Sequence, residues 1–339
     1  MAGITHLEDF QKPALRGLVD ETMKDGTESF ADRYLPNENT FSTKFAYDII
    51  KSNKYIAAMI GHGSEAPVVD RNQVASMAGE MAKMGLKYVA TEEELLALHQ
   101  ARNNAESQAM VDNLTFEGVQ LVDAMLRRID VIKLEALTKG SFSYKKHGVE
   151  VNVDFGVPAE NKKSLTSGND WADSGHDVIG DLLTWNQEYE DANGESPDAI
   201  YMSREVQALL LKNATIVTEA SGSGSGRTRV SVEELNSVLG GYGLPPVNVV
   251  TNRKVTVKNV ASGENEVIEF FPVNRVVMLS EGIGNFLLGP TVENDFQPGI
   301  VLTAEDLRAP IRSVMETVAA GFPAIEQPSR IFHADVFTP

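Results

Sequence analysis

The sequence contains no cysteine among its 339 residues. Disulfide bridges and thiolate chemistry are therefore excluded, and any covalent link between chains must use other groups. The sequence also lacks an apolar run long enough to span a membrane. Residues 1–18 lack the apolar core of a signal peptide. We therefore expect a protein with no membrane association that is made and kept in a cytosol-like compartment.

Basic residues are scarce relative to acidic ones. The chain has 30 Lys and Arg against 48 Asp and Glu, which gives a net charge of −18. A protein that grips nucleic acid through its phosphates needs a basic surface, so this balance argues against tight DNA binding. This charge balance still permits a protein wall that faces DNA without binding it tightly. The like charge also keeps free subunits soluble.

Sequence motifs for catalysis or metal binding are missing as well. The six histidines are scattered, and none lies four residues from another. The Gly/Ser run at 221–226 is followed by Arg227, where a phosphate-binding loop would need lysine and then serine or threonine. Asp170, Asp173 and Asp177 lack the dense alternation of oxygen ligands of a calcium loop, so we interpret them as helix-start and loop charges. The sequence therefore predicts no catalytic residue, no metal site and no cofactor.

The longest pattern that is present is an apolar stripe over residues 101–139. Its members recur in steps of three and four, which predicts one long helix with a buried face. They are Val111, Leu114, Leu121, Val122, Met125, Ile129, Ile132 and Ala136, and Gly118 fills the gap in the stripe. Lys139 and Gly140 predict the C-terminal end of the helix. By itself the stripe fits a core helix of any globular protein, or a spine helix that carries a subunit in an assembly.

The segments before this helix carry weaker signals. Residues 1–45 are weakly amphipathic and predict an arm that lies on a partner or stays mobile. Residues 44–56 predict a short strand. Glycines and Pro67 punctuate residues 56–89, which predicts an extended loop. The methionines of this loop suit packing on a neighbouring chain, and a loose surface loop fits them equally. Acidic residues begin helical structure at 92–101.

The segments after the helix mix strands and helices. Alternating apolar residues over 141–158 predict a β-hairpin that turns near His147 and Gly148. We also expect helices at 173–194, 204–214 and 231–243, strands at 196–203 and across 244–282, a flexible Gly/Ser run at 218–230, an apolar loop at 283–290, and an edge strand with a return at 316–337.

The order of these parts resembles the Hong Kong 97 phage capsid fold, and in detail the lambda-type major capsid protein (protein E) family. The resemblance is carried by IKLEALTKGSFSY, VEVNVDFG, HDVIGDLLTW, PDAIYMSREVQALLL and GFPAIEQPSRIFHADVF. These stretches are similar to the family's spine-helix end, first strand, linker tryptophan with its helix, next strand and helix, and last strands. The resemblance implies an α+β fold and departs from the family at the Gly/Ser run and in the first hundred residues.

The resemblance also implies a division of the chain into four parts. Residues 1–45 would form an N-terminal arm and residues 56–89 an extended loop. Residues 44–55, 90–165 and 300–339 would form a peripheral P-domain around the spine helix at about 101–139. Residues 166–299 would form an axial A-domain.

A structural role without catalysis follows from the same resemblance. It implies a major capsid protein whose pentamers and hexamers form an icosahedral shell around double-stranded phage DNA, in a virion assembled in the host bacterial cytoplasm. The implied partners are a separate scaffolding protein, a portal, and DNA without specific binding. The sequence leaves open whether a decoration protein also binds. The candidate contacts between subunits are Glu65, Asp70, Arg71, Met77, Glu80, Lys83, Lys87, Arg227 and Arg229.

Some alternatives stay open on the sequence. In the founding member of the fold a loop lysine joins an asparagine of a neighbour, but Lys83 and Lys87 come without the matching partner motif, and exposed charge is the simpler interpretation. An encapsulin-like nanocompartment shell would share the fold. A soluble α/β enzyme would need a site that is assembled only in three dimensions.

Overall fold

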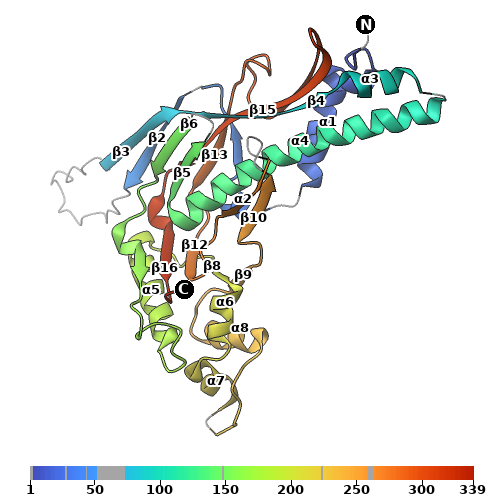
Figure 1. Cartoon of the computed structure of the whole chain (residues 1–339). Coiled ribbons are helices and arrows are strands. Elements are labelled where there is room, and N and C mark those ends of the chain that lie inside the picture. Colours follow the sequence, from blue (N-terminus) through green and yellow to red (C-terminus); the bar gives the residue numbers. More distant parts are fainter. Residues whose placement is uncertain are drawn as a thin grey trace, which may run out of the picture. The chain divides into compact units, whose positions relative to one another are not determined.

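The computed structural model describes residues 3–26, 29–42, 44–51, 73–101, 103–146, 149–222, 224–258 and 263–339 (Figure 1). Its internal contacts divide the chain into two compact units. The first comprises Met1–Ala46, Ala78–Lys133 and Asn285–Ala324, and the second comprises Tyr47–Met77, Leu134–Gly284 and Ile325–Pro339. Each unit is therefore built from stretches that lie far apart in the sequence.

The five described helices of the first unit are η1 (Glu8–Phe10), α1 (Lys12–Asp25), α2 (Phe30–Tyr34), α3 (Glu92–His99) and α4 (Asn104–Lys139), whose last turns belong to the second unit. Three of them, α2, α3 and α4, begin at side chains that cap free backbone N–H groups. Capping boxes start α2 at Ser29 and α3 at Thr91. The backbone N–H of Glu106 donates to Asn103 Oδ1 over 2.9 Å. This cap separates α4 from α3, so the predicted long helix is confirmed with its start at Asn104.

The apolar stripe of α4 is buried, as its spacing predicts. Val111, Leu114, Leu121 and Val122 pack in one core with side chains of α1, α3 and three strands. A Cβ added at Gly118 would lie 3.4 Å from Leu302 and 3.5 Å from Leu18. The gap in the stripe is therefore the place where a strand and a second helix come close to α4.

A five-stranded sheet forms the other layer of the first unit. Its strands are β1 (Asn37–Asn39), β13 (Gly284–Gly289), β15 (Ile311–Ile325) and β14 (Val301–Arg308) in that order, with β4 (Ala82–Ala90) also paired with β15. Both β14 and β4 run antiparallel to β15. Figure 1 shows β15 as a long curved strand beside β4.

Two predictions for this sheet are wrong. The edge strand expected within 316–337 is β15, which is a central strand because it pairs with β13, β14 and β4. Pro323 does not interrupt the pairing with β4, because that pairing ends at Gly321. The apolar loop expected at 283–290 is β13, in which Phe286 and Leu288 alternate into the core and pair with β1.

A separate two-stranded sheet joins β2 (Lys44–Lys51) and β3 (Gln73–Glu80). The strand expected at 44–56 is therefore confirmed as far as Lys51. Residues 52–72, which hold most of the expected extended loop, lie outside the described residues. The described remainder of that loop consists of β3 and most of β4.

The second unit has its own five-stranded mixed sheet. The strands are β7 (Lys162–Ser164), β16 (Ile331–Asp335), β12 (Arg275–Leu279), β8 (Ala199–Ser203) and β9 (Val247–Val250) in that order. The helices are α5 (Val178–Asn193), α6 (Arg204–Leu210), α7 (Ala214–Ser221), α8 (Val232–Gly241) and the short η2 (Ala159–Asn161) and η3 (Pro328–Arg330). Two hairpins, β5 (Ser141–Lys146) with β6 (Val149–Asp154) and β10 (Lys254–Lys258) with β11 (Asn265–Glu269), complete the unit.

Both tryptophans of the chain lie in the core of the second unit. Trp171 stacks on Trp185 with ring centroids 5.7 Å apart, and Trp185 also contacts Phe332 of β16. The indole N–H of Trp171 donates to Asp181 on α5 over 2.9 Å. The loop before α5 is therefore anchored by an aromatic contact whose polar atom is also satisfied.

Predicted elements of the second unit are confirmed except at their boundaries. The hairpin over 141–158 is β5 and β6, although its turn residues lie outside the described part. The helix predicted at 204–214 stops at Leu210, since Asn213 caps a new helix by accepting from the N–H groups of Thr215 and Ile216. That helix, α7, ends at Ser221, so residues 218–221, which were expected to be the start of a flexible run, are helical. None of the described helices is both long and apolar enough for a membrane span.

Candidate assembly surfaces

The predicted contact residues of the extended loop fall into three groups. Glu65, Asp70 and Arg71 lie outside the described residues, and Met77 and Glu80 lie on β3. Lys83 and Lys87 lie on the exposed face of β4, within its pairing with β15. The structure thus brings the two lysines together on one strand face, and it does not place them on a free loop.

Each of these lysines faces a carboxylate of its own chain. Lys87 is directly opposite Glu316 on β15, with 3.5 Å between Nζ and Oε1. Lys83 Nζ lies 2.6 Å from Glu293, which follows β13. The hydrogen bond from Lys83 is the largest of the effects that lower the pKa of Glu293. Because both lysine side chains are more than half exposed, each pair contributes at most about 1 kcal/mol of stability.

Glu293 belongs to a compact loop at residues 290–299, between β13 and β14. An isolated β-bridge between Pro290 and Pro298 closes this loop. The Asn294 side chain donates to the carbonyl oxygens of Gln297 and Pro298, and the N–H of Phe296 donates to Thr291 O over 3.0 Å. The loop therefore has a defined conformation of its own.

The backbone of the 290–299 loop is strained at its tip. Asp295 and Phe296 have φ values of 51° and 60°, in the left-handed region that favours glycine. Aspartate tolerates this region, whereas a left-handed conformation costs phenylalanine about 1–2 kcal/mol. An ion pair of 3.0 Å between Asp295 and Lys12 of α1 helps to hold the tip.

The 290–299 loop also presents apolar side chains to solvent. Val292 and Phe296 are each 68% exposed, and Phe41 is 73% exposed. Phe41 belongs to the same end of the sheet, because β1 runs parallel to β13 and Thr40 N–H donates to Leu288 O over 2.8 Å. Among the described residues these are the three most exposed large apolar side chains. Sequence reasoning missed them, although two apolar residues among the turn-forming residues of TVENDFQPG were an available signal.

In the second unit, Arg227 is engaged within its own chain. Its guanidinium forms two hydrogen bonds of 2.7 Å with the carboxylate of Glu234 in the first turn of α8. These bonds, together with the backbone N–H of Ser231, lower the pKa of Glu234 to about 2. Arg229 is exposed and has no ion pair with another described residue. Of the two predicted arginine contacts that the structure describes, Arg229 is thus the one without an ion pair.

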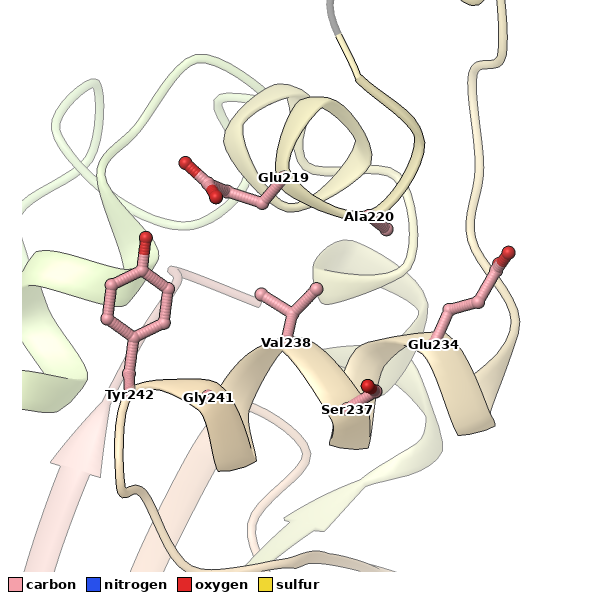
Figure 2. A pocket seen from close by; sticks show the side chains of 7 residues that line it. All are labelled: Glu219, Ala220, Glu234, Ser237, Val238, Gly241 and Tyr242. Atoms are coloured by element: carbon pink, nitrogen blue, oxygen red, sulfur yellow. The ribbon is translucent and has the colours of Figure 1, made fainter.

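A shallow cleft lies between α7 and α8 (Figure 2). Its volume is about 410 Å³, and its lining includes Glu219, Glu234, Val238 and Tyr242. The two carboxylates lie on either side of a small apolar floor (Figure 2). The lining also includes Ser237, and among these described residues no hydrogen bond joins its hydroxyl to either carboxylate.

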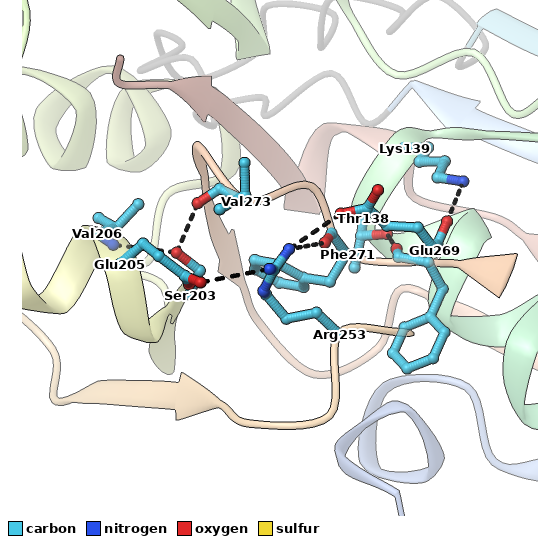
Figure 3. Close-up of polar contacts among 10 residues, drawn as sticks. Thr138, Lys139, Ser203, Glu205, Val206, Arg253, Glu269, Phe271 and Val273 are labelled. Carbon is cyan, nitrogen blue, oxygen red and sulfur yellow. Dashed lines mark hydrogen bonds and ion pairs between the residues drawn. The ribbon is translucent and has the colours of Figure 1, made fainter. Parts of the chain in front are cut away.

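A polar network fixes the C-terminal end of α4 in the second unit (Figure 3). Lys139 donates to Glu269 O over 2.7 Å, and the Thr138 hydroxyl donates to Phe270 O. Arg253 reaches Glu269 over 2.9 Å and Glu205 over 3.4 Å. These contacts join α4, β11 and α6, and their role is structural.

A buried charge holds α2 against α4 in the first unit. Lys133 is 1% exposed, its Nζ lies 2.5 Å from Asp32, and the ring centre of Phe286 lies 5.5 Å away. Burial raises the pKa of the neighbouring Asp130 carboxyl. Lys133 lies four residues after Ile129 of the apolar stripe, which places it on the same face of α4. No group of three His, Asp or Glu side chains in the described ranges could hold a metal ion.

Comparison with known proteins identifies the family to which this chain belongs. The sequence profile of the phage major capsid protein E family matches residues 21–305. The chain belongs to this family. It is therefore a major capsid protein, a shell-forming structural component of the phage virion. No curated protein sequence matches it.

Solved structures support the same assignment at the level of the fold. A protein described as a prophage capsid protein from E. coli CFT073 is 15% identical, with a TM-score of 0.62 over 96% of this chain and 98% of that one. The mature capsid protein of bacteriophage PhiM1 is 10% identical, with a TM-score of 0.51 over 91% and 87%. A chain of the satellite phage P4 procapsid, solved with its size determination protein, is 12% identical, with a TM-score of 0.50 over 97% and 100%. The predicted α+β fold of the Hong Kong 97 type is thus confirmed.

Identification as a major capsid protein changes the meaning of the exposed features. A shell subunit must carry surfaces that stay exposed in the free chain and become buried against identical copies. The 290–299 loop presents Val292 and Phe296 to solvent, and Phe41 and Arg229 are exposed as well. The paired Lys83, Lys87 and Arg227 stabilise the subunit's own surface.

Proposed function

We propose that pentamers and hexamers of this chain close into an icosahedral shell that encloses a double-stranded DNA phage genome. The observation that carries the proposal is the match to the major capsid protein family over residues 21–305. The long α4 helix supports it, because a rigid helix can hold distant surfaces of one subunit at fixed positions. Many weak contacts, repeated by symmetry, would then stabilise the shell.

The same proposal assigns parts of the chain to roles. Residues 1–45 act as the arm and residues 56–89 as the extended loop. Residues 44–55, 90–165 and 300–339 form the P-domain, and residues 166–299 form the A-domain. Contacts between copies include Glu65, Asp70, Arg71, Met77, Glu80, Lys83, Lys87, Arg227 and Arg229, with Arg229 the arginine that has no ion pair among the described residues.

The proposed partners follow from the role of the shell. A separate scaffolding protein directs assembly in the host cytoplasm, and a portal occupies one vertex. The P4 procapsid, which contains a size determination protein, supports a partner of the first kind. The net charge of −18 supports a wall that faces DNA without binding it specifically. The shell subunit has no catalytic activity in this proposal.

Electron microscopy and sedimentation of the purified chain test the proposal, with the chain alone and with the scaffolding protein of the same phage. Closed icosahedral shells, and DNA-filled shells from infected cells, are the expected result. Small shells that hold a protein cargo instead of DNA would favour a nanocompartment. A small oligomer that never assembles under either condition would refute the shell function.

A further inference from the structure

The 290–299 loop combines backbone strain with exposure. Phe296 is held in a left-handed conformation by the bond from its N–H to Thr291 and by the side chain of Asn294. Yet the phenyl ring is 68% exposed and therefore adds little to the core of its own subunit. A strained position that only displays a side chain is typical of a binding site.

The loop is also fixed before any partner arrives. The Pro290–Pro298 bridge closes its base, and ion pairs to Lys12 and Lys83 tie its tip and side to α1 and β4. Val292 and Phe296 are therefore presented on a framework that is already ordered, so docking costs little conformational entropy. Phe41 extends the apolar surface at the same end of the sheet.

The charges around the loop select the kind of partner. Residues 290–299 contain no lysine or arginine, which argues against contact with DNA. Their two carboxylates, Glu293 and Asp295, are already paired with Lys83 and Lys12. Two copies of a chain with a net charge of −18 repel each other, so they meet best where carboxylates are neutralised and apolar groups are exposed.

We propose that Val292 and Phe296 insert into a neighbouring copy of this chain when the shell forms, with Phe41 at the margin of the contact. The proposal rests on the shell function proposed above and adds the surface through which copies meet. It commits to a second copy because a major capsid protein is surrounded by identical chains, and each apolar insertion is repeated at every equivalent position.

Substitutions that keep the loop backbone test the contact. Phe296→Asn removes the ring and places a residue that tolerates the left-handed region, while Val292→Thr keeps the side-chain shape. Phe296→Tyr keeps the ring. The matched control is Val267→Thr, at a 56% exposed position on β11 in the second unit. We expect Phe296→Asn and Val292→Thr to lower the shell yield at fixed subunit concentration by about tenfold, and Phe296→Tyr and Val267→Thr to assemble like the unchanged chain. The unfolding midpoint should be unchanged for Val292→Thr and unchanged or higher for Phe296→Asn, because asparagine relieves the backbone strain.

The absence of cysteine allows a direct identification of the partner. Phe296→Cys introduces a single thiol that a benzophenone maleimide can label. Illumination of assembled shells should give a chain-to-chain adduct that free subunits do not give. If the unchanged chain forms shells and Phe296→Asn forms them equally well, this inference is wrong while the shell function stands. Adducts only with a different phage protein would also overturn it, and failure of the unchanged chain to assemble would instead reject the shell function.

Discussion

Gly118 offers a quantitative test of the packing around α4. It is buried in the middle of the helix, and a Cβ placed there would meet Leu302 at 3.4 Å and Leu18 at 3.5 Å, which are ordinary contact distances. Gly118→Ala should gain about 1 kcal/mol from helix propensity. The buried methyl group adds up to about 0.8 kcal/mol, less any adjustment of Leu302. We therefore expect the free energy of unfolding to rise by about 1–2 kcal/mol.

Gly17 on α1 is the matched control, because nothing lies within 4 Å of a Cβ placed there. Gly17→Ala should gain only the propensity contribution, about 1 kcal/mol. Urea unfolding followed by circular dichroism, on subunits shown by sedimentation to be unassembled, measures both variants. If Gly17→Ala stabilises the chain while Gly118→Ala destabilises it, α4 is packed more tightly against Leu302 and Leu18 than described here, and the reasoning fails.

Two further predictions concern buried groups. Met125 on the α4 stripe is 3% exposed, so Met125→Asp buries a charge. The variant should lose at least about 4 kcal/mol of folding free energy and give no soluble folded subunit. A soluble, folded variant would contradict the packing of α4. His333 in β16 is buried against Leu137 O at 2.7 Å, and burial lowers its pKa to about 4. As the pH falls, His333 takes up a proton in the unfolded chain before it does so in the folded chain, which favours unfolding. The folded state therefore keeps its full stability above about pH 6.5 and loses stability as the pH falls towards 4, by about 2 kcal/mol at pH 5. Urea unfolding at both ends of this range should show a smaller pH dependence for His333→Gln, and an equal dependence would exclude His333 as the cause.

Local patterns predicted much of the fold. The steps of three and four along α4 identify its buried face, because a helix repeats its side-chain directions at that spacing. Ser231 and Glu234 form the capping box that the sequence indicates at the start of α8. Such features depend on residues within a few positions of one another, so the sequence alone contains the necessary information.

Features that depend on distant pairing were less accessible. β13 looks like an apolar loop until β1 supplies its partner, and β15 looks like an edge strand until β4 pairs with it. The apolar surface of the 290–299 loop lies on a strained turn that is held by hydrogen bonds within the loop and is contacted by Lys12 and Lys83. Neither lysine is near the loop in sequence, so the contact could not be read from local spacing.

The pairing of β4 with β15 has a consequence for biosynthesis. Residues 82–90 leave the ribosome long before residues 313–321, with which they form a ladder in the finished sheet. The first unit therefore cannot complete its sheet cotranslationally until nearly all of the second unit has been made. The 290–299 loop also emerges late, long after α1 and β4, whose Lys12 and Lys83 pair with its carboxylates. We therefore expect assembly contacts that need this finished sheet to form only between completed chains.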